Sequence, residues 1–299
     1  MSRLQRPPVV VGVDGSADSR RATGYAAGEA ARRHLPLRLV HGLQPPTMYS
    51  AGTFVAVEIG AVVADVRAML LENATKVHAR YPSLKVTTAV IAGYPAAVLV
   101  GVSRAASLVV VGSRGFGGLR GMLAGSTGAQ VAAHAHAPVI VVRPPAAEDA
   151  QLPPDPGTGV LVGVDGSTGS AAALDFAFAE AGAHGSQLTA VYAWDSPPTT
   201  NLGPITRRHY DPVEAQEEAD RMLSEALAGW QEKYPGVRVT RRAVHSLNPL
   251  ATLVAQSREA ALVVVGARGR GGFAGLRLGS VSDGLVRHAH RPVAVVHAD

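Results

Sequence analysis

Apolar residues gather in short runs that alternate along the chain with longer stretches of mixed character. In the first half, five β-branched runs predict strands, and stretches with helical periodicity between them predict helices. The expected strands are residues 9–13, 37–41, 86–91, 108–111 and 139–142, and the expected helices are residues 17–33, 61–81 and 96–106. Nearly continuous apolar strands that alternate with helices are typical of a parallel sheet covered on both faces. The pattern therefore predicts an α/β fold.

The pattern occurs twice because the sequence repeats itself. Residues 10–16 recur at 161–167, an offset of 151, and residues 108–115 recur at 262–269, an offset of 154. One small insertion therefore separates two otherwise similar copies.

The repeat predicts two tandem domains. Between the copies lies a segment rich in proline, alanine and acidic residues, a composition typical of an extended linker. We expect one domain over residues 1–143, a linker over 144–158 and a second domain over 159–299. Each should be a doubly wound α/β domain with a five-stranded parallel sheet of strand order 3-2-1-4-5, flanked by helices.

In the second copy, a helical pattern separates an apolar face from a polar one. The apolar positions are Leu223, Leu227 and Trp230, and the polar positions are Glu217, Glu218 and Asp220. We interpret the acidic residues as a solvent-exposed face.

A glycine-rich loop follows the fourth expected strand of each copy. The two loops share one spacing: Gly112-x2-Gly115-x9-Gly125-Ser126 and Gly266-x2-Gly269-x9-Gly279-Ser280. Glycine tolerates positive φ and allows the backbone to approach a ligand closely. Each loop leads into a helix, whose first N–H groups and positive dipole end favour an anion, and we expect Ser126 and Ser280 to be the N-caps. A single loop of this kind is often a plain turn, but the repeated spacing favours a phosphate-binding loop.

The expected strand order places these loops in a crevice. Asp14 ends the first strand and Gly112 ends the fourth, and Asp165 and Gly266 repeat this arrangement. Strands 1 and 4 are neighbours whose outgoing loops diverge, and ligands bind at such points in doubly wound sheets. For Asp14 and Asp165, an Asx-turn that closes the strand is an alternative, and both roles can coexist.

These motifs resemble the universal stress protein family, whose ATP-binding members carry G-x2-G-x9-G-[S/T]. The resemblance covers nearly the whole chain, in two copies. It implies ATP in each half, with ribose and phosphates held by the glycines and serines of both loops, and Asp14 and Asp165 near the adenosine. Further positions complete the implied binding set: Gly12 and Gly163 beneath the nucleotide, Gly42 and Ala193 at the adenine, Ser113, Arg114, Ala267 and Arg268 within the loops, and Thr127 and Val281 as backbone donors. Arg114 and Arg268 could neutralise phosphate or face solvent.

Several enzyme motifs are absent from the sequence. There is no G-x-x-x-x-G-K-[ST], no dinucleotide-binding G-x-G-x-x-G after the first strand and no G-x-S-x-G. We therefore expect a nucleotide sensor or regulator of the stress response, with no catalytic residue and no protein-bound metal; Mg²⁺ would arrive with the triphosphate. A slow ATPase or nucleotidyl-transfer enzyme is the alternative function, and a ligand-independent interaction module is a third hypothesis.

The amino-acid composition limits the kinds of partner that the protein is expected to bind. The 299 residues include no cysteine, which rules out disulfides and thiolate metal sites. The net charge of +5 is mild, Arg and Lys are scattered, and aromatic residues are only 5%, so we expect no nucleic-acid partner. Without an apolar stretch of membrane-spanning length or a signal-peptide pattern, we expect a cytoplasmic protein that binds no membrane. The apolar fifth strands, residues 139–142 and 293–296, are expected to pair, so that the halves form a pseudo-dimer; a homo-oligomer stays open.

Overall fold

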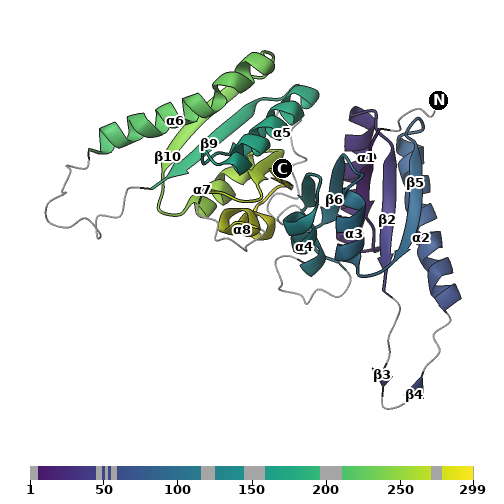
Figure 1. The fold of residues 1–299 in the computed structure, drawn as a ribbon. Coiled ribbons are helices and arrows are strands. Elements are labelled where there is room, and N and C mark those ends of the chain that lie inside the picture. Colours follow the sequence, from purple (N-terminus) through teal and green to yellow (C-terminus); the bar gives the residue numbers. More distant parts are fainter. Residues whose placement is uncertain are drawn as a thin grey trace. The chain divides into compact units, whose positions relative to one another are not determined.

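The computed structural model describes residues 6–44, 49–50, 53–54, 59–115, 125–144, 159–195, 211–270 and 278–298. The chain divides into two compact units, Met1–Pro144 and Pro145–Asp299, and each unit is an α/β domain (Figure 1). The expected linker lies, apart from Pro144, outside the described residues.

The first unit is built on a five-stranded parallel sheet. Its strands are β1 (Val9–Gly12), β2 (Leu37–Leu43), β5 (Val86–Ala92), β6 (Leu108–Gly112) and β7 (Val139–Val142). They lie in the order β5-β2-β1-β6-β7, and every neighbouring pair is parallel. This is the predicted order 3-2-1-4-5, so the fold prediction is confirmed.

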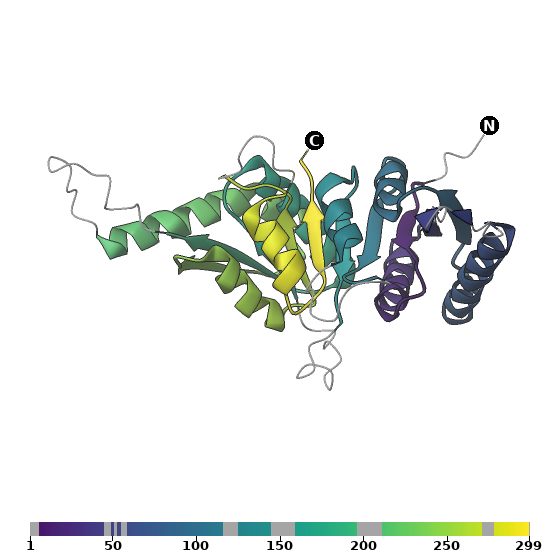
Figure 2. The same ribbon diagram turned by 90° about the horizontal axis from the view of Figure 1, so that it is seen from below.

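Helices cover both faces of this sheet. They are α1 (Ala17–Arg32), α2 (Ile59–Arg80), α3 (Pro95–Ser103) and α4 (Ser126–His134). Helices α1 and α2 contact each other on one face, and α3 and α4 contact each other on the other (Figures 1 and 2). The valines and leucine of β1 and β6 between them are buried, as apolar strands covered on both faces should be.

The second unit repeats this architecture. Its strands are β8 (Val160–Gly163), β9 (Leu188–Trp194), β10 (Val239–His245), β11 (Leu262–Gly266) and β12 (Val293–Val296). They lie in the order β10-β9-β8-β11-β12, again parallel throughout. Its helices are α5 (Thr168–His184), α6 (Pro212–Lys233), α7 (Pro249–Gln256) and α8 (Ser280–His288), with a 3-10 turn at Ser257–Glu259.

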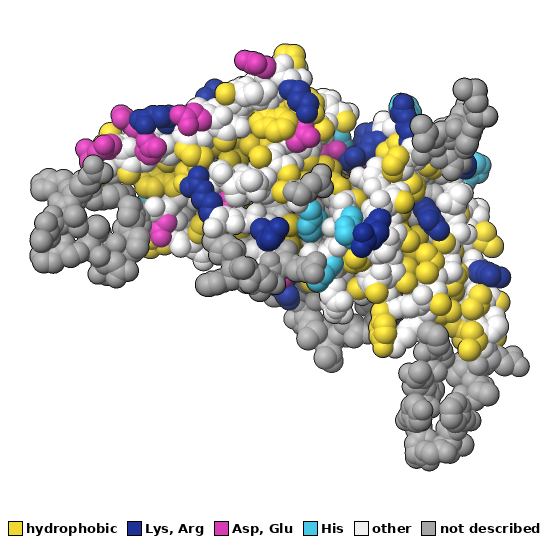
Figure 3. Space-filling view, viewed as in Figure 1, with side chains coloured by type: hydrophobic (Ala, Val, Ile, Leu, Met, Phe, Trp, Pro, Cys, Tyr) yellow, Lys and Arg dark blue, Asp and Glu magenta, His cyan; other side chains and the backbone are white. Residues whose placement is uncertain are grey.

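Helix α6 has the predicted polar and apolar faces. Leu223 and Leu227 are fully buried. Glu217, Glu218 and Asp220 are exposed, and acidic side chains follow the outer side of α6 (Figure 3). The amphipathic pattern is therefore confirmed.

Two features differ from the expected pattern. Strand β2 extends to Leu43, two residues beyond the expected end, because its backbone continues to pair with β5 through Gly42 and Leu43. A two-stranded antiparallel sheet, β3 (Tyr49–Ser50) with β4 (Thr53–Phe54), was not expected, since strands of two residues leave no periodic pattern. Within the described ranges, no helix combines the length and apolar character needed to cross a bilayer.

Candidate functional site

A cleft of about 610 Å³ opens at the carboxyl ends of β1, β2 and β6 in the first unit. It is lined by nine of the residues singled out from the sequence: Gly12, Asp14, Gly42, Gly112, Arg114, Gly115, Gly125, Ser126 and Thr127. Sequence reasoning missed the rest of the lining: Val13, Ser19, Val40, His41, Pro95, Leu99, Val111 and Gly128. The crevice predicted from the strand order therefore contains both ends of the first glycine loop.

The glycine loop returns to its own start. The amide N–H of Gly125 donates to the carbonyl oxygen of Ser113 at 2.7 Å, which closes the loop just before α4 begins. In the second unit, the amide of Gly279 donates to the carbonyl oxygen of Ala267 at the same distance. Both helix N-termini are thus fixed at the end of the preceding strand.

The predicted capping residues were wrong by one position. Gly125 and Gly279 are the N-caps, with extended backbones at φ −73° and −72°, while Ser126 and Ser280 are the first helical residues. A glycine cap has no side-chain acceptor, so none of the described side chains caps either helix. Their first amide groups therefore suit an anion better than a serine-capped helix would.

The glycines of the repeated spacing do not supply positive φ, which corrects a second expectation. None of the six motif glycines has positive φ; Gly15 and Gly166, in the turns after β1 and β8, do, at +85° and +74°. The first two glycines of each motif are needed for close packing instead. A Cβ on Gly115 would lie 2.7 Å from Asp14 Oδ2, and one on Gly112 would lie 2.8 Å from the carbonyl carbon of Asp18.

Asp14 holds both the turn and the loop. Its Oδ1 accepts the amide N–H of Ser16 at 2.9 Å, which is the Asx-turn considered from the sequence. Its Oδ2 lies against Gly115, so the carboxylate also supports the glycine loop. Asp14 nonetheless lines the cleft, and the two roles coexist.

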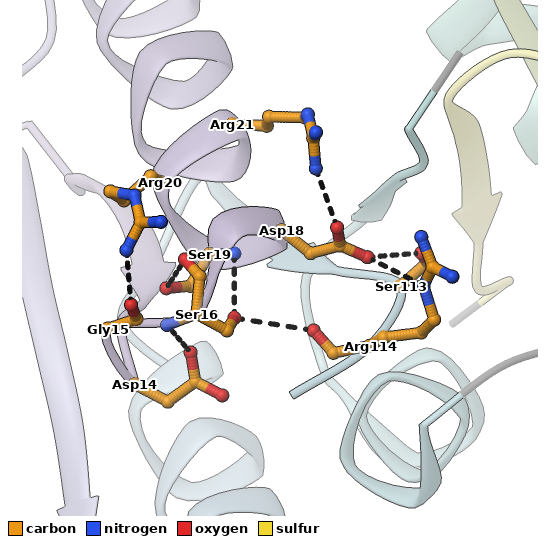
Figure 4. Close-up of polar contacts among 9 residues, drawn as sticks. All are labelled: Asp14, Gly15, Ser16, Asp18, Ser19, Arg20, Arg21, Ser113 and Arg114. Carbon is orange, nitrogen blue, oxygen red and sulfur yellow. Dashed lines mark hydrogen bonds and ion pairs between the residues drawn. The ribbon is translucent and has the colours of Figure 1, made fainter. Parts of the chain in front are cut away.

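A buried carboxylate lies beneath the same loop. Asp18 Oδ2 accepts hydrogen bonds from Ser113 Oγ at 3.0 Å and Arg114 Nε at 3.2 Å, and Oδ1 accepts one from Arg21 Nη1 at 2.8 Å (Figure 4). Ser113, expected at the nucleotide, is buried and bonds to Asp18. Arg114 lines the cleft but is paired with Asp18. Burial and the neighbouring Arg114 lower the pKa of Arg143, and Asp18 opposes this effect.

The opposite wall of the cleft is tightly packed and partly apolar. A Cβ on Gly42 would lie 2.7 Å from Pro95 Cα, so only glycine lets the start of α3 lie this close to β2. The His41 ring lies beside it, with Nδ1 2.7 Å from the carbonyl oxygen of Val13. Because a carbonyl oxygen can only accept, Nδ1 carries the proton of this hydrogen bond. Leu99 lies against Gly12 from the adjacent helix.

The second unit repeats part of this geometry. Asp165 Oδ1 accepts the amide of Ser167 at 3.0 Å, and Oδ2 accepts the amide of Arg270 at 3.0 Å. Gly269 lies against the same carboxylate, as Gly115 lies against Asp14. The Arg270 guanidinium packs on Gly166.

The remaining predicted positions of the second unit are distributed over β8, β9, the glycine loop and α8. A Cβ on Gly163 would lie 3.2 Å from Leu253 Cδ1. Ala193 is half-buried near the end of β9. Arg268 is exposed, and Val281 is half-buried at the second residue of α8. Residues 271–277 of this loop lie outside the described residues.

Fold and site together define a tandem pair of doubly wound α/β domains, each with a glycine loop that ends at an uncapped helix. The universal stress protein family model matches residues 6–143 and 158–297. The chain belongs to the universal stress protein family, as the sequence resemblance indicated.

Relatives match over nearly the whole length. A universal stress protein of Mycolicibacterium smegmatis is 40% identical over 300 residues, which cover 96% of each chain. A universal stress protein of Mycobacterium tuberculosis is 37% identical over 296 residues, covering 96% of this chain and 95% of that one. The crystal structure of a universal stress protein from Archaeoglobus fulgidus has a TM-score of 0.70 at 20% identity and covers 98% and 97% of the two chains, which shows a shared fold.

Proposed function

We propose that this universal stress protein binds ATP, one molecule in each half, and acts as a nucleotide-dependent regulator of the stress response. The observation that carries the proposal is the first-unit cleft, where the glycine loop and the uncapped N-terminus of α4 face a space of about 610 Å³. This volume lies within the range of about 300–1,000 Å³ that is usual for small-molecule sites.

The residues of the cleft suit the two ends of a nucleotide. At one end, the backbone amides of Ser126, Thr127 and Gly128 would hold phosphate oxygens. Hydrogen bonds to a charged group contribute about 1.5–3 kcal/mol each. At the other end, the backbone near Gly42, beside His41, would hold the adenine.

The polar groups of this cleft favour ATP binding without ATP hydrolysis. Hydrolysis needs a base that orients a water toward the γ-phosphate. Asp14 is the one carboxylate among the described lining residues, and it already supports the turn and the loop. Mg²⁺ would be carried by the phosphates, because a single carboxylate that already forms hydrogen bonds within the protein does not provide enough ligands for a Mg²⁺ site.

Mass spectrometry of the nucleotide released by denaturing the purified protein tests the proposal, together with calorimetric titration of ATP into stripped protein. We expect an adenine nucleotide and two binding events per chain. Absence of both released nucleotide and ATP binding would instead favour a ligand-independent interaction module. A steady-state hydrolysis rate near about 1 per second would favour the enzyme alternative.

A further inference from the structure

Asp18 joins α1 to the start of the first glycine loop. It is the second residue of α1, after the N-cap Ser16, and its side chain is 7% exposed. Its carboxylate accepts from Ser113 and Arg114, which are 95 and 96 residues away in the sequence (Figure 4). A buried carboxylate needs such partners, and removing them would leave an uncompensated charge.

Ser113 connects this carboxylate to the amides proposed to hold phosphate. Its hydroxyl donates to Asp18, and its carbonyl oxygen accepts the amide of Gly125, the N-cap of α4. Ser16 Oγ adds a longer hydrogen bond of 3.4 Å to the carbonyl oxygen of Arg114. Two consecutive contacts therefore lead from Asp18 to the N-terminus of α4.

The second half lacks three of these side chains. Gly169 occupies the position of Asp18, Ala267 that of Ser113 and Ala172 that of Arg21. The carbonyl oxygen of Arg268 lies so close to Gly169 that no side chain would fit there. The loop thus rests directly on the backbone of α5, and among the described residues Arg268 forms no ion pair.

We infer that Asp18 is a positioning residue that holds the start of the first glycine loop, Ser113 and Arg114, against α1, and that the first half consequently binds adenine nucleotide more tightly than the second. A site that is ordered before its ligand arrives loses less conformational freedom on binding. Arg114 is also oriented by its pair with Asp18, at the edge of the cleft, whereas Arg268 lacks that constraint. This inference rests on the proposed function of the site.

The experiment measures each site separately in the full-length chain. Gly279→Val leaves the first site and Gly125→Val leaves the second, and calorimetry gives the ATP dissociation constant of each. We expect the first site to bind at least about tenfold more tightly. Within the Gly279→Val background, Asp18→Ala and Ser113→Ala should each weaken ATP binding about tenfold. Because Asp18 and Ser113 share one hydrogen bond, the loss in the double variant should be smaller than the sum of the two single losses.

Two further variants separate positioning from general stability. Asp18→Asn keeps an acceptor for Ser113 and should recover part of the affinity. Glu72→Ala, which removes an exposed carboxylate paired with Lys76 in α2, is the matched control and should bind like its parent. Urea unfolding midpoints identify any variant that fails to fold. If Asp18→Ala does not fold, the ATP affinities of Asp18→Asn and Ser113→Ala test the positioning role in its place.

The possible results have distinct meanings. Affinity unchanged by Asp18→Ala, or fully additive losses in the double variant, would overturn the positioning role. Equal affinities of the two sites would overturn the asymmetry. If the Gly279→Val parent is folded but binds no ATP, the proposed function itself fails. If only the Asp18 variants lose ATP binding, the proposed function stands and the positioning role is supported.

Discussion

Replacing Gly125 with valine tests the phosphate-binding loop with little disturbance of the fold. The backbone of Gly125, at φ −73° and ψ 148°, lies in a region open to every residue. A Cβ there would lie 3.4 Å from the carbonyl oxygen of Ser113 and 3.6 Å from the amide nitrogen of Gly115, which is ordinary contact. The added side chain would therefore stand between the loop and the start of α4, where the phosphates are proposed to bind.

The expected effects on binding and stability differ in size. Loss of two amide–phosphate hydrogen bonds, at about 1.5–3 kcal/mol each, removes about 3–6 kcal/mol. At about 1.4 kcal/mol per factor of ten, ATP affinity at this site should fall by at least about 100-fold. Valine is a poorer N-cap than glycine, but it restricts the unfolded chain, so unfolding free energy should change by less than about 1 kcal/mol.

Calorimetric titration of stripped protein with ATP measures this effect. The stoichiometry should fall from two sites to one, and Gly279→Val should remove the other site. The double variant should bind no ATP and still unfold cooperatively in urea. Gly101→Val is the control, because Gly101 lies in α3 with open space around it. A stoichiometry of two in either single variant would place the phosphates in another loop and refute the reasoning.

Three further outcomes follow from the geometry. ATP hydrolysis by protein freed of contaminating ATPases should be far slower than about 1 per second, as radiolabelled phosphate release would measure; a faster rate contradicts the binder. Gly42→Val should weaken ATP binding by about tenfold or more and destabilise the fold by about 1–3 kcal/mol, because its Cβ would force Pro95 away; calorimetry and urea unfolding check both values. Phe178→Ala should cost about 3–5 kcal/mol in urea unfolding, since the fully buried ring stacks against Trp230 and Tyr234; a loss below 1 kcal/mol would contradict this.

The strand order could be predicted because two independent patterns agreed. Apolar runs alternating with helices indicated a doubly wound sheet, for which the order 3-2-1-4-5 was expected, and the repeat showed the same pattern in both halves. The ends of the strands were harder to predict. Strand β2 continues through Gly42 and Leu43 because its pairing with β5 extends beyond the apolar run. The turn after β1 was also foreseeable, because Asp-Gly-Ser contains both the Asx acceptor and the glycine with positive φ.

The candidate site could be located from the sequence but not built from it. Spacing identified the two ends of the glycine loop, yet the N-cap is Gly125 and not Ser126, a choice that depends on the hydrogen bond from its amide to Ser113. His41 and Leu99 reach the cleft from β2 and α3, and nothing in their local sequence distinguishes them from ordinary core or surface positions. Such lining residues follow from the packing of elements, which periodicity does not specify.

The two halves show why matching motifs do not guarantee matching sites. Both loops keep the same spacing, and both Asp14 and Asp165 make the same Asx-turn. The difference lies outside the motif, at position 18 in one half and 169 in the other. An aspartate there provides a buried acceptor for the loop, whereas a glycine lets the loop rest on the helix backbone. Since this position decides how the loop is supported before a ligand arrives, the difference in affinity between the two halves should depend on it, because the motif glycines are the same in both.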